Sequence, residues 1–514
     1  MDIKMTNQSR TEHSIRNTTV AMITQIVSVL LSFVTRTVFI KKLGADYLGV
    51  NGLFSNILTM LSLAEMGVGT AIIYAMYKPL AEKDEKKISA LMSLYERLYR
   101  IIGLVVAGIG LALVPFLDVF IKERPAIPYL EGIYLLYLAN TVFSYFFTYK
   151  RSIIIADQQG YLSNLNTTNF LILQNIVQIV LLQATGNYYL FLITQIVCTV
   201  ISNVVISRKA DRMYPYLRKY KKETLTKSDK QSLWKSVVGM MSSKLGAAVV
   251  NGTDNLLISA FVGVYTVGLY SNYKLIVNTV KTLFVQCVSA VTASVGNLNA
   301  TESREKSSEF FFKIDFVNYV LAYFGSLYIF SLINPFVELW LGKEYILSMK
   351  VVLVLILDFY VIQMRQAPQI YINTYGLFWQ IKWKSILEAV INLMVSLLFV
   401  AYFKWGVFGV LLGTLVSNIA TNLWWEPYVV FRFGLDMPFS RYIVLYLKNI
   451  GFLMVNMVII DLLQSTIEAE GIAMLIRKGI IVTLIGGGTF VAVNYKKAEF
   501  KYCISIMKRF LYKH

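Results

Sequence analysis

Long apolar segments separated by short polar ones run along the whole chain. From residue 18 onward the apolar segments are about 20 residues long or longer, which is the length that an α-helix needs to cross a bilayer. The pattern predicts an all-α, polytopic membrane protein with about fourteen crossing helices, because a helix satisfies its own backbone hydrogen bonds in lipid. The expected ranges are 18–40, 48–77, 90–118, 128–149, 161–184, 187–207, 234–261, 266–297, 309–336, 346–368, 380–402, 406–431, 441–463 and 471–494.

Composition supports a membrane protein and argues against soluble classes. Of the 514 residues, 56% are hydrophobic and only 15% are charged, so a soluble domain of this size would have a largely apolar surface. The three cysteines, Cys198, Cys287 and Cys503, have no spacing that is typical of a disulfide framework or a metal site. The two histidines lie near the termini, so the sequence offers no histidine catalysis inside the membrane, and we expect no catalytic residue, metal or cofactor.

The net charge of +19 is explained by where the basic residues fall. Most Lys and Arg lie in loops on the side that holds both termini, and the positive-inside rule makes that side cytoplasmic. The largest of these basic loops separates the sixth and seventh helices, at 208–234. The basic tail at 495–514 alternates Lys and Arg with apolar residues and predicts an amphipathic helix on anionic membrane lipids. No nucleic-acid partner is needed to account for the charge.

An internal repeat divides the chain into two copies of one six-helix unit. Gly44 and Gly49 flank a segment that matches the segment from Gly263 to Gly268, at an offset of 219 residues, and Thr199-Val-Ile-Ser-Asn203 is echoed at Thr414 to Asn418. Copies with an even number of helices have the same orientation and are related by an axis along the membrane normal. We expect an N-terminal lobe at 1–207, the basic linker at 208–234, a C-terminal lobe at 235–432, two further helices at 433–494 and the tail at 495–514.

The segment from Met241 to Lys281 predicts two crossing helices that carry ionisable residues. An ionisable side chain at mid-bilayer costs about 2.5 to 3.5 kcal/mol, so it usually faces a cavity or a partner. Polar residues share one face of each helix. On the first helix they are Lys244, Asn251 and Asn255, with Asp254 at the edge, and on the second Tyr270, Lys274, Asn278 and Lys281. The lysines either line a wet cavity or extend to the membrane interface; the spacing favours the cavity for Lys274 and Lys281, and leaves both open for Lys244.

The first helix carries a matching polar stripe, and two further helices carry single acids. The stripe consists of Gln25, Ser28, Ser32, Thr35 and Arg36. At the repeat offset Arg36 corresponds to Asn255, which puts it at the depth of Asp254 and suggests an ion pair between the two lobes; anchoring of Arg36 at the interface is the alternative. Glu65 and Asp358 are, with Asp254, candidates for coupling to an ion, and structural pairing with a neighbouring helix is an equal alternative for Glu65 and Asp358. Gly67 and Gly69 are typical of close helix packing.

The chain resembles the bacterial polysaccharide transporters and lipid-linked oligosaccharide flippases of the multidrug/oligosaccharidyl-lipid/polysaccharide exporter superfamily. The resemblance rests on the repeated helix pattern and on three segments, KLGADYLGVNGLFSNILTMLSLAEMGVGTAI from Lys42, TDNLLIS from Thr253 and VGLYSNYKL from Val267. It implies two six-helix lobes that open alternately to the two sides of the plasma membrane. It also implies transport of an undecaprenyl-pyrophosphate-linked repeat unit for capsule, O-antigen or exopolysaccharide. Polysaccharide polymerase and glycosyltransferases are the partners that this role implies.

Such a substrate fits the positions of the cations. A pyrophosphate brings negative charge into the bilayer, and Arg36, Lys244, Lys274 and Lys281 could compensate it, with Asn251, Asn255 and Tyr270 beside them. A multidrug antiporter of the same fold is an alternative, although its cationic substrates would call for acids where Arg36 stands. A membrane-embedded polymerase or ligase is a second alternative, which would usually carry a sizeable outer loop that this sequence lacks.

Overall fold

The fold is helical throughout the part of the chain that the structure describes. The computed structural model describes residues 2–65, 68–122, 125–157, 159–289, 295, 303–377, 379–465 and 471–511, and within these ranges it leaves out some side chains, among them those of 2–22, 238–251 and 505–511. No β-strand occurs in these residues. The helices form two compact units, Met1–Gly268 and Leu269–His514, which we describe one at a time.

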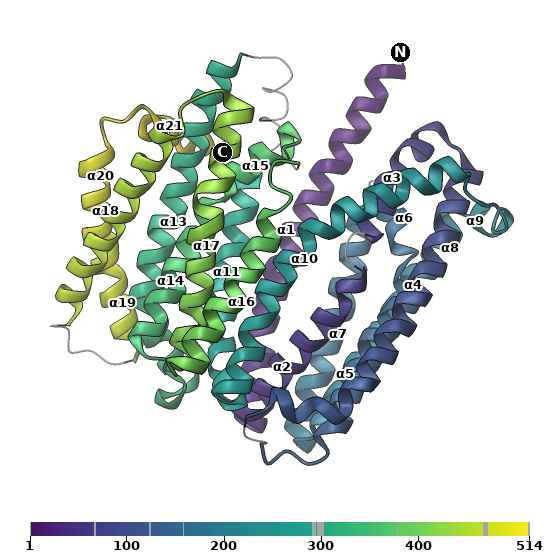
Figure 1. Cartoon of the computed structure of the whole chain (residues 1–514), viewed down its shortest axis with the longest axis horizontal. Helices are drawn as coiled ribbons and strands as arrows, with labels where there is room; N and C mark the ends of the chain where they lie inside the picture. The colour runs from purple at the N-terminus through teal and green to yellow at the C-terminus, as the bar shows by residue number, and fades with distance from the viewer. Residues whose placement is uncertain are drawn as a thin grey trace. The chain divides into compact units, whose positions relative to one another are not determined.

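The N-terminal unit is built from the purple to teal helices of Figure 1. Within it α1 packs against α7, α5 against α4 and α8, and α10 against α2 and α3. Its elements are α1 Asp2–Leu43, α2 Ala45–Leu61, the 3₁₀ turn η1 Ser62–Glu65, α3 Val68–Glu82, α4 Glu85–Leu113, the 3₁₀ turn η2 Val114–Phe120, α5 Leu130–Thr148, α6 Arg151–Ala156, α7 Gly160–Thr185, α8 Tyr188–Met213, α9 Tyr216–Lys219 and α10 Lys227–Phe261.

Local sequence signals explain where several of these helices begin and end. Asn187 caps α8 by accepting hydrogen bonds from the backbone N–H groups of Tyr189 and Leu190, and Thr226 caps α10 in the same way. Gly186 ends α7 in the left-handed conformation that glycine adopts without strain.

The C-terminal unit, teal to yellow in Figure 1, is organised around α13. This helix contacts α14, α15, α18, α19 and α21, and α17 packs against α14, α15 and α16. The elements are α11 Val264–Ser289, α13 Arg304–Leu341, the 3₁₀ turn η3 Lys343–Tyr345, α14 Met349–Met364, α15 Gln366–Tyr375, α16 Lys384–Leu397, the π-helical turn η4 Leu398–Tyr402, α17 Gly406–Val429, the π-helical turn η5 Val430–Leu435, α18 Ser440–Gln464, α19 Gly471–Ile481, the π-helical turn η6 Val482–Gly486, α20 Gly487–Asn494 and α21 Ala498–Leu511.

Most helices follow the predicted ranges, and the differences have local causes. The helix expected at 48–77 is interrupted by the 3₁₀ turn Ser62–Glu65, so it forms two helices. The helix expected at 346–368 divides at Arg365 into α14 and α15. The tail expected to be an amphipathic helix contains α21.

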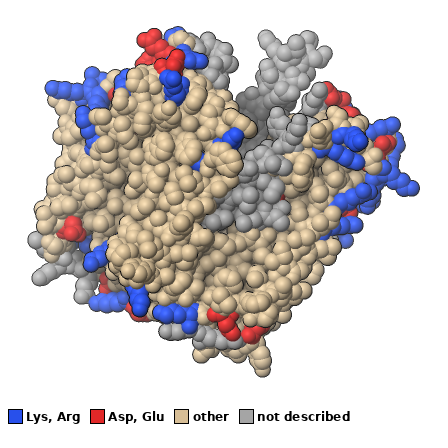
Figure 2. All heavy atoms as spheres, in the orientation of Figure 1, with Lys and Arg blue, Asp and Glu red and all other residues tan. Residues whose placement is uncertain are grey.

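The helices have the length and surface of a multi-pass membrane protein. Ten helices in the described residues are long and apolar enough to cross a membrane, and the other predicted crossings coincide with α2 and α3, α5, α10 and α11. On the face shown in Figure 2, charged side chains gather near the helix ends and the surface between them is mostly uncharged. Large apolar side chains such as Leu104, Leu462 and Leu484 are exposed to 64–67%, as expected of a surface that faces lipid.

The repeat glycines bring two matched segments into direct backbone contact, both within Met1–Gly268, which includes the first turn of α11. A Cβ added to Gly49 would lie 2.0 Å from the carbonyl oxygen of Val264, and one added to Gly268 would lie 2.3 Å from that of Ala45. Val264 and Gly268 are the repeat counterparts of Ala45 and Gly49, so the two contacts exchange partners as a twofold axis requires. Gly44, with φ of 86°, and Gly263, with φ of 140°, occupy the matching turns that precede the two segments.

Candidate functional site: a buried charge network

A polar stripe runs along α17 on the side that faces α14 and α16. Its side chains recur every three or four residues, which places them on one face of the helix. All are less than 7% exposed, so their polar groups need partners inside the protein. The stripe consists of Thr414, Ser417, Asn418, Thr421, Asn422 and Glu426.

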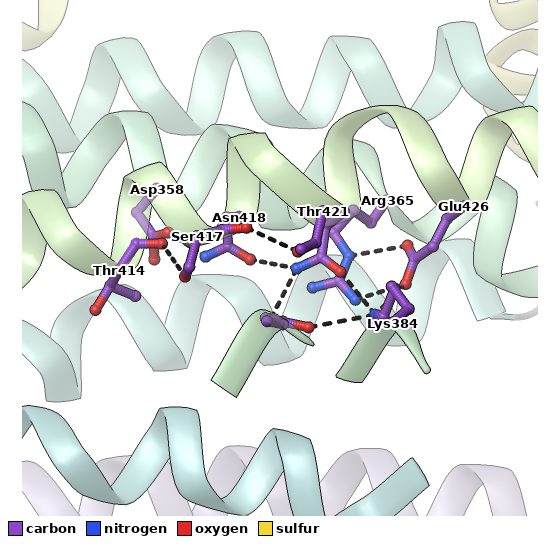
Figure 3. A network of polar contacts seen from close by, with 10 residues as sticks. Asp358, Arg365, Lys384, Thr414, Ser417, Asn418, Thr421 and Glu426 are labelled. Atoms are coloured by element: carbon purple, nitrogen blue, oxygen red, sulfur yellow. Dashed lines mark hydrogen bonds and ion pairs between the residues drawn. The ribbon is translucent and has the colours of Figure 1, made fainter. Parts of the chain in front are cut away.

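Glu426 is held by two cations from other helices (Figure 3). Arg365, between α14 and α15, makes a two-pronged contact: its Nε donates to Oε2 at 2.9 Å and its Nη2 to Oε1 at 2.7 Å. Lys384, the first residue of α16, donates to the same Oε1 at 2.7 Å. Both the Lys384 and Glu426 side chains are at most 5% exposed. A carboxylate in this position is stable only because both cations compensate its charge.

The network continues from Lys384 along α17 to Asp358 of α14. The Lys384 ammonium lies 3.4 Å from the carboxylate of Glu388 and donates to Oδ1 of Asn422 at 2.6 Å. The Asn422 amide donates to Glu388 at 2.7 Å and to Asn418, and Asn418 donates to Asp358 at 2.7 Å. The chain of contacts therefore links α14, α16 and α17 without a break. Its ends, Asp358 and Arg365, are half-buried, whereas its middle is buried.

The predicted stripe on α11 lies beside this network. The Lys274 ammonium lies 5.5 Å from the centre of the Tyr270 ring, a cation–π contact that puts the two on one face as predicted. Lys281 is half-buried and lies within electrostatic range of Asp358, Arg365 and Lys274. Three cations from α11 and the end of α14 thus lie in one region of the C-terminal unit.

The predicted residues of the N-terminal unit fall on α1 and α10. Arg36 is half-buried, whereas Asp254 and Asn255 are each 5% exposed. The ion pair between Arg36 and Asp254 stays a prediction. The backbones of Lys244 and Asn251 lie in α10, but their side chains lie outside the described residues.

Glu65 has a structural partner in the same unit. Its carboxylate accepts a hydrogen bond from the Tyr99 hydroxyl of α4, and the Tyr99 ring packs edge-on against Tyr95 at 4.4 Å. A Cβ on Gly69 would lie 2.7 Å from the Tyr95 hydroxyl and 2.9 Å from that of Tyr99, so Gly69 is a close-packing position as predicted. Gly67 lies outside the described residues. A role of Glu65 in ion coupling stays a prediction.

The sequence interpretation missed most of the charge network. Arg365, Lys384, Glu388 and Glu426 were not among its candidates. The spacing of the polar residues on α17 was visible in the sequence and could have pointed to a buried stripe. In the described residues, no group of His, Cys, Asp and Glu side chains is suited to hold a metal ion, and the three cysteines are free thiols.

Known proteins resemble the chain in structure. No protein-family model matches the sequence, and a search of curated proteins finds no significant match. An inward-closed structure of the lipid II flippase MurJ matches with a TM-score of 0.65 and 13% sequence identity, over 94% of this chain and all of that one.

Two transporters of the MOP superfamily match as well. An inward-facing MATE-family multidrug resistance transporter matches with a TM-score of 0.61 and 15% identity, over 80% of this chain and 98% of that one. A transporter from Pyrococcus furiosus, whose binding pocket is described as having reverse polarity, matches with a TM-score of 0.53 and 14% identity, over 84% and 97%. The chain therefore has the fold of the MOP superfamily, the multidrug/oligosaccharidyl-lipid/polysaccharide exporters.

Proposed function

We propose that the chain is a flippase that carries polyprenyl-pyrophosphate-linked oligosaccharide repeat units across the bacterial plasma membrane by alternating access. The membrane-embedded helical fold supports a transport role, and one structure with this fold is of a lipid II flippase. The proposed product is the outer-leaflet precursor of a capsule, an O-antigen or an exopolysaccharide. A polysaccharide polymerase would consume it, and glycosyltransferases on the cytoplasmic side would supply the substrate.

The observation that carries the proposal is the cluster of half-buried cations Lys274, Lys281 and Arg365 in the C-terminal unit. A pyrophosphate that enters the membrane needs positive charge to replace its hydration. Arginine suits a bidentate contact with phosphate oxygens, and lysine is a mobile point charge that can pass a substrate on. The apolar polyprenyl tail would remain in the lipid.

A multidrug antiporter is the second candidate, because structures with this fold include MATE-family transporters. Such a protein needs acids that can bind a cationic drug. Here each acid of the network accepts a hydrogen bond from within the protein: Asp358 from Asn418, Glu388 from Asn422 and Glu426 from Arg365. These internal contacts compete with a cationic substrate, so they favour the flippase.

The orientation in the membrane follows from the charge of the loops. Basic loops and the basic tail favour a cytoplasmic position for both termini. The basic linker at 208–234 and the tail after Asn494 would then both contact the anionic inner leaflet.

The test is the leaflet distribution of lipid-linked oligosaccharides in cells depleted of the protein. A membrane-impermeant lectin or hydrolase reports only the outer leaflet. We expect complete repeat units to accumulate on the cytoplasmic side. If they reach the outer leaflet at the normal rate and stay unpolymerised, the flippase proposal is wrong and a polymerase is favoured.

Variants connect this assay to the cation cluster. Lys274→Ala and Lys281→Ala should each lower the rate of export at least tenfold without loss of protein from the membrane, because each removes a cation that replaces the hydration of the pyrophosphate. A tenfold change corresponds to about 1.4 kcal/mol. Lys343→Ala is the matched control, because that lysine is exposed to 83% at a helix end. Normal export by both variants would show that transport does not depend on the cation cluster.

A further inference from the structure

Asp315 of α13 is a buried carboxyl group that has no partner in the described part of the chain. The residue is 2% exposed, and its Oδ1 atom is fully buried without a hydrogen bond. None of the ion pairs found in the described residues includes it. Glu426 is buried to the same degree, but Arg365 and Lys384 compensate its charge. The two acids therefore differ in their partners and not in their burial.

An isolated carboxylate is not stable in such a place. Its transfer from water to an apolar interior costs far more than a folded protein can offset, and the group takes up a proton instead. A protonated carboxyl group needs only ordinary hydrogen-bond partners. The burial of Asp315 without a cation therefore indicates that this residue is neutral in the conformation described.

Three more polar atoms on α14 and α18, which pack against α13, are also buried without a hydrogen bond: the hydroxyls of Tyr360 and Tyr446 and Oε1 of Gln363. Asn318, one turn after Asp315, donates to the Gln363 carbonyl at 2.8 Å and accepts from its side-chain amide at 2.9 Å. This exchange aligns the face of α13 that bears Asp315 with the face of α14 that bears Tyr360. Unsatisfied buried donors and acceptors in one place are the usual sign of a site for an ordered water.

The ionisable groups near Asp315 are phenols. Tyr360, Tyr442 and Tyr446 lie within electrostatic range of its carboxyl group. They come from α14 and α18. On α13 itself, two phenylalanine rings close to Asp315 make cation–π contacts. Arg441 lies 4.4 Å from the centre of the Phe312 ring, and Lys497 lies 5.9 Å from the centre of the Phe316 ring.

These two cations are engaged with aromatic rings and form no ion pair with Asp315 in the described residues. Two ion pairs on the first turns of α13 use other acids: Lys313 pairs with Glu309, and Arg304 pairs with Asp436 in the loop before α18. No described cation from an element packed on α13 thus takes the place of a proton on Asp315.

We propose that Asp315 is a proton-binding site and that the unsatisfied polar groups of Tyr360, Gln363 and Tyr446 on the neighbouring helices serve it. A proton from the water side forms an O–H bond on the carboxyl group, and the bond breaks when water reaches that group and takes up the proton. Asp315 lies about three helical turns from the start of α13, and Tyr446 less than two turns from the start of α18, so the path to water is short.

The site is also placed to communicate with the charge network. Tyr442 lies within electrostatic range of both Asp315 and Glu426. Asp315 therefore lies on the side of the C-terminal unit where the network holds Arg365. The use of this proton to drive transport rests on the proposed function, whereas the binding of the proton does not.

Infrared difference spectroscopy of the full-length protein in liposomes tests the binding directly. We expect the wild type to show the carbonyl band of a protonated carboxylic acid near neutral pH, and Asp315→Asn to lack it. Asp461→Asn is the matched control, because Asp461 is exposed on α18 and should not contribute to that band. Asp315→Glu should restore a shifted band if the Asn variant is poorly folded.

Two results would overturn the proposal. In one, the spectrum of Asp315→Asn lacks a carboxylate band of the wild type and keeps the acid band, which would mean that Asp315 is ionised. Another is loss of the acid band when sodium ions are added at constant pH, which would make the site a metal-cation site.

A second experiment on the same liposomes measures how fast the protein translocates a lipid-linked oligosaccharide under a pH gradient. The wild type should respond to the gradient, and Asp315→Asn should lose that response. If the wild type moves no such lipid, the proposed function fails, and the infrared result still decides the proton site. A full response to the gradient by Asp315→Asn would rule out a role of Asp315 in coupling.

Discussion

The two units stabilise a glutamate inside a helix bundle in different ways, at the half-buried Glu65 and at the buried Glu426. In the N-terminal unit Glu65 accepts a hydrogen bond from the neutral Tyr99 hydroxyl. In the C-terminal unit Glu426 is compensated by Arg365 and Lys384, and the ion pairs extend through hydrogen bonds to Asp358. The repeat is visible where backbones pack, at Gly49 and Gly268, and it extends to one ion pair, because Lys150 and Asp211, joined at 2.7 Å, lie 215 residues before Arg365 and Glu426.

The largest effect should follow removal of the charge at the centre of the network. Glu426→Gln leaves the buried Lys384 and the half-buried Arg365 without full compensation, and breaking a buried ion pair typically costs about 3–5 kcal/mol. We expect the largest fall in melting temperature of the purified protein among the variants considered. Arg365→Met added to Glu426→Gln should recover part of the loss, because it removes a cation that has lost its ion-pair partner, whereas Lys384 keeps Glu388 at 3.4 Å.

The control for this prediction is Glu338→Gln, since Glu338 is partly exposed and its contact with Lys343 is long, at 3.6 Å. A surface pair of this kind contributes less than about 1 kcal/mol. Equal effects of Glu426→Gln and Glu338→Gln would mean that the network adds no stability through its charges.

A second prediction tests the feature that the repeat preserves. Gly49→Ala and Gly268→Ala each place a Cβ within 2.3 Å of a backbone carbonyl oxygen, so the helices must move apart. Overpacking of this kind costs about 1–3 kcal/mol, and the exchange of partners predicts losses of similar size for the two variants. Thermal unfolding would measure both. Gly451→Ala is the control, because a Cβ there meets open space and should be neutral or slightly stabilising. A harmless Gly268→Ala beside a harmful Gly49→Ala would contradict the twofold exchange.

A smaller effect is expected at the glutamate of the N-terminal unit. Glu65→Gln keeps an oxygen that can accept from the Tyr99 hydroxyl, so the loss should be smaller than that of one hydrogen bond, about 1 kcal/mol. Tyr99→Phe removes the bond altogether and should lower the melting temperature by more than Glu65→Gln does. The contrast between the units would disappear if Glu65→Gln were as damaging as Glu426→Gln.

The smallest effect should come from an ion pair at the surface of the N-terminal unit. Lys87 donates to Asp229 at 2.8 Å, and this bond, with one from Thr226, holds the pKa of Asp229 below its usual range. A carboxyl group with a lowered pKa adds stability above its unfolded-state pKa of about 3.9, and the contribution is lost as the pH falls through the folded-state pKa. Asp229→Asn should therefore lower the melting temperature slightly at neutral pH, by the equivalent of less than about 1 kcal/mol, and not at all in strong acid. A difference that grew on acidification would have the wrong sign.

The sequence by itself determined the class of fold. Apolar segments long enough to cross a bilayer are expected to form α-helices, because their backbone N–H and C=O groups find no water in the lipid and must form hydrogen bonds within the segment. The glycines at the two matched turns were also visible, and so was the shared face of Tyr270 and Lys274, because both are local patterns set by the helical period.

Tertiary structure decided which charges meet. Arg365 and Glu426 are 61 residues apart, and Asp358 and Asn418 are 60 apart. Their contact depends on how α14 and α17 rotate and pack against one another, which no local pattern specifies. The isolation of Asp315 is a result of the same kind. A carboxyl group on an apolar helix looks alike in sequence whether a cation reaches it or not, and only the packing of α13, α14 and α18 showed that none of the described cations does.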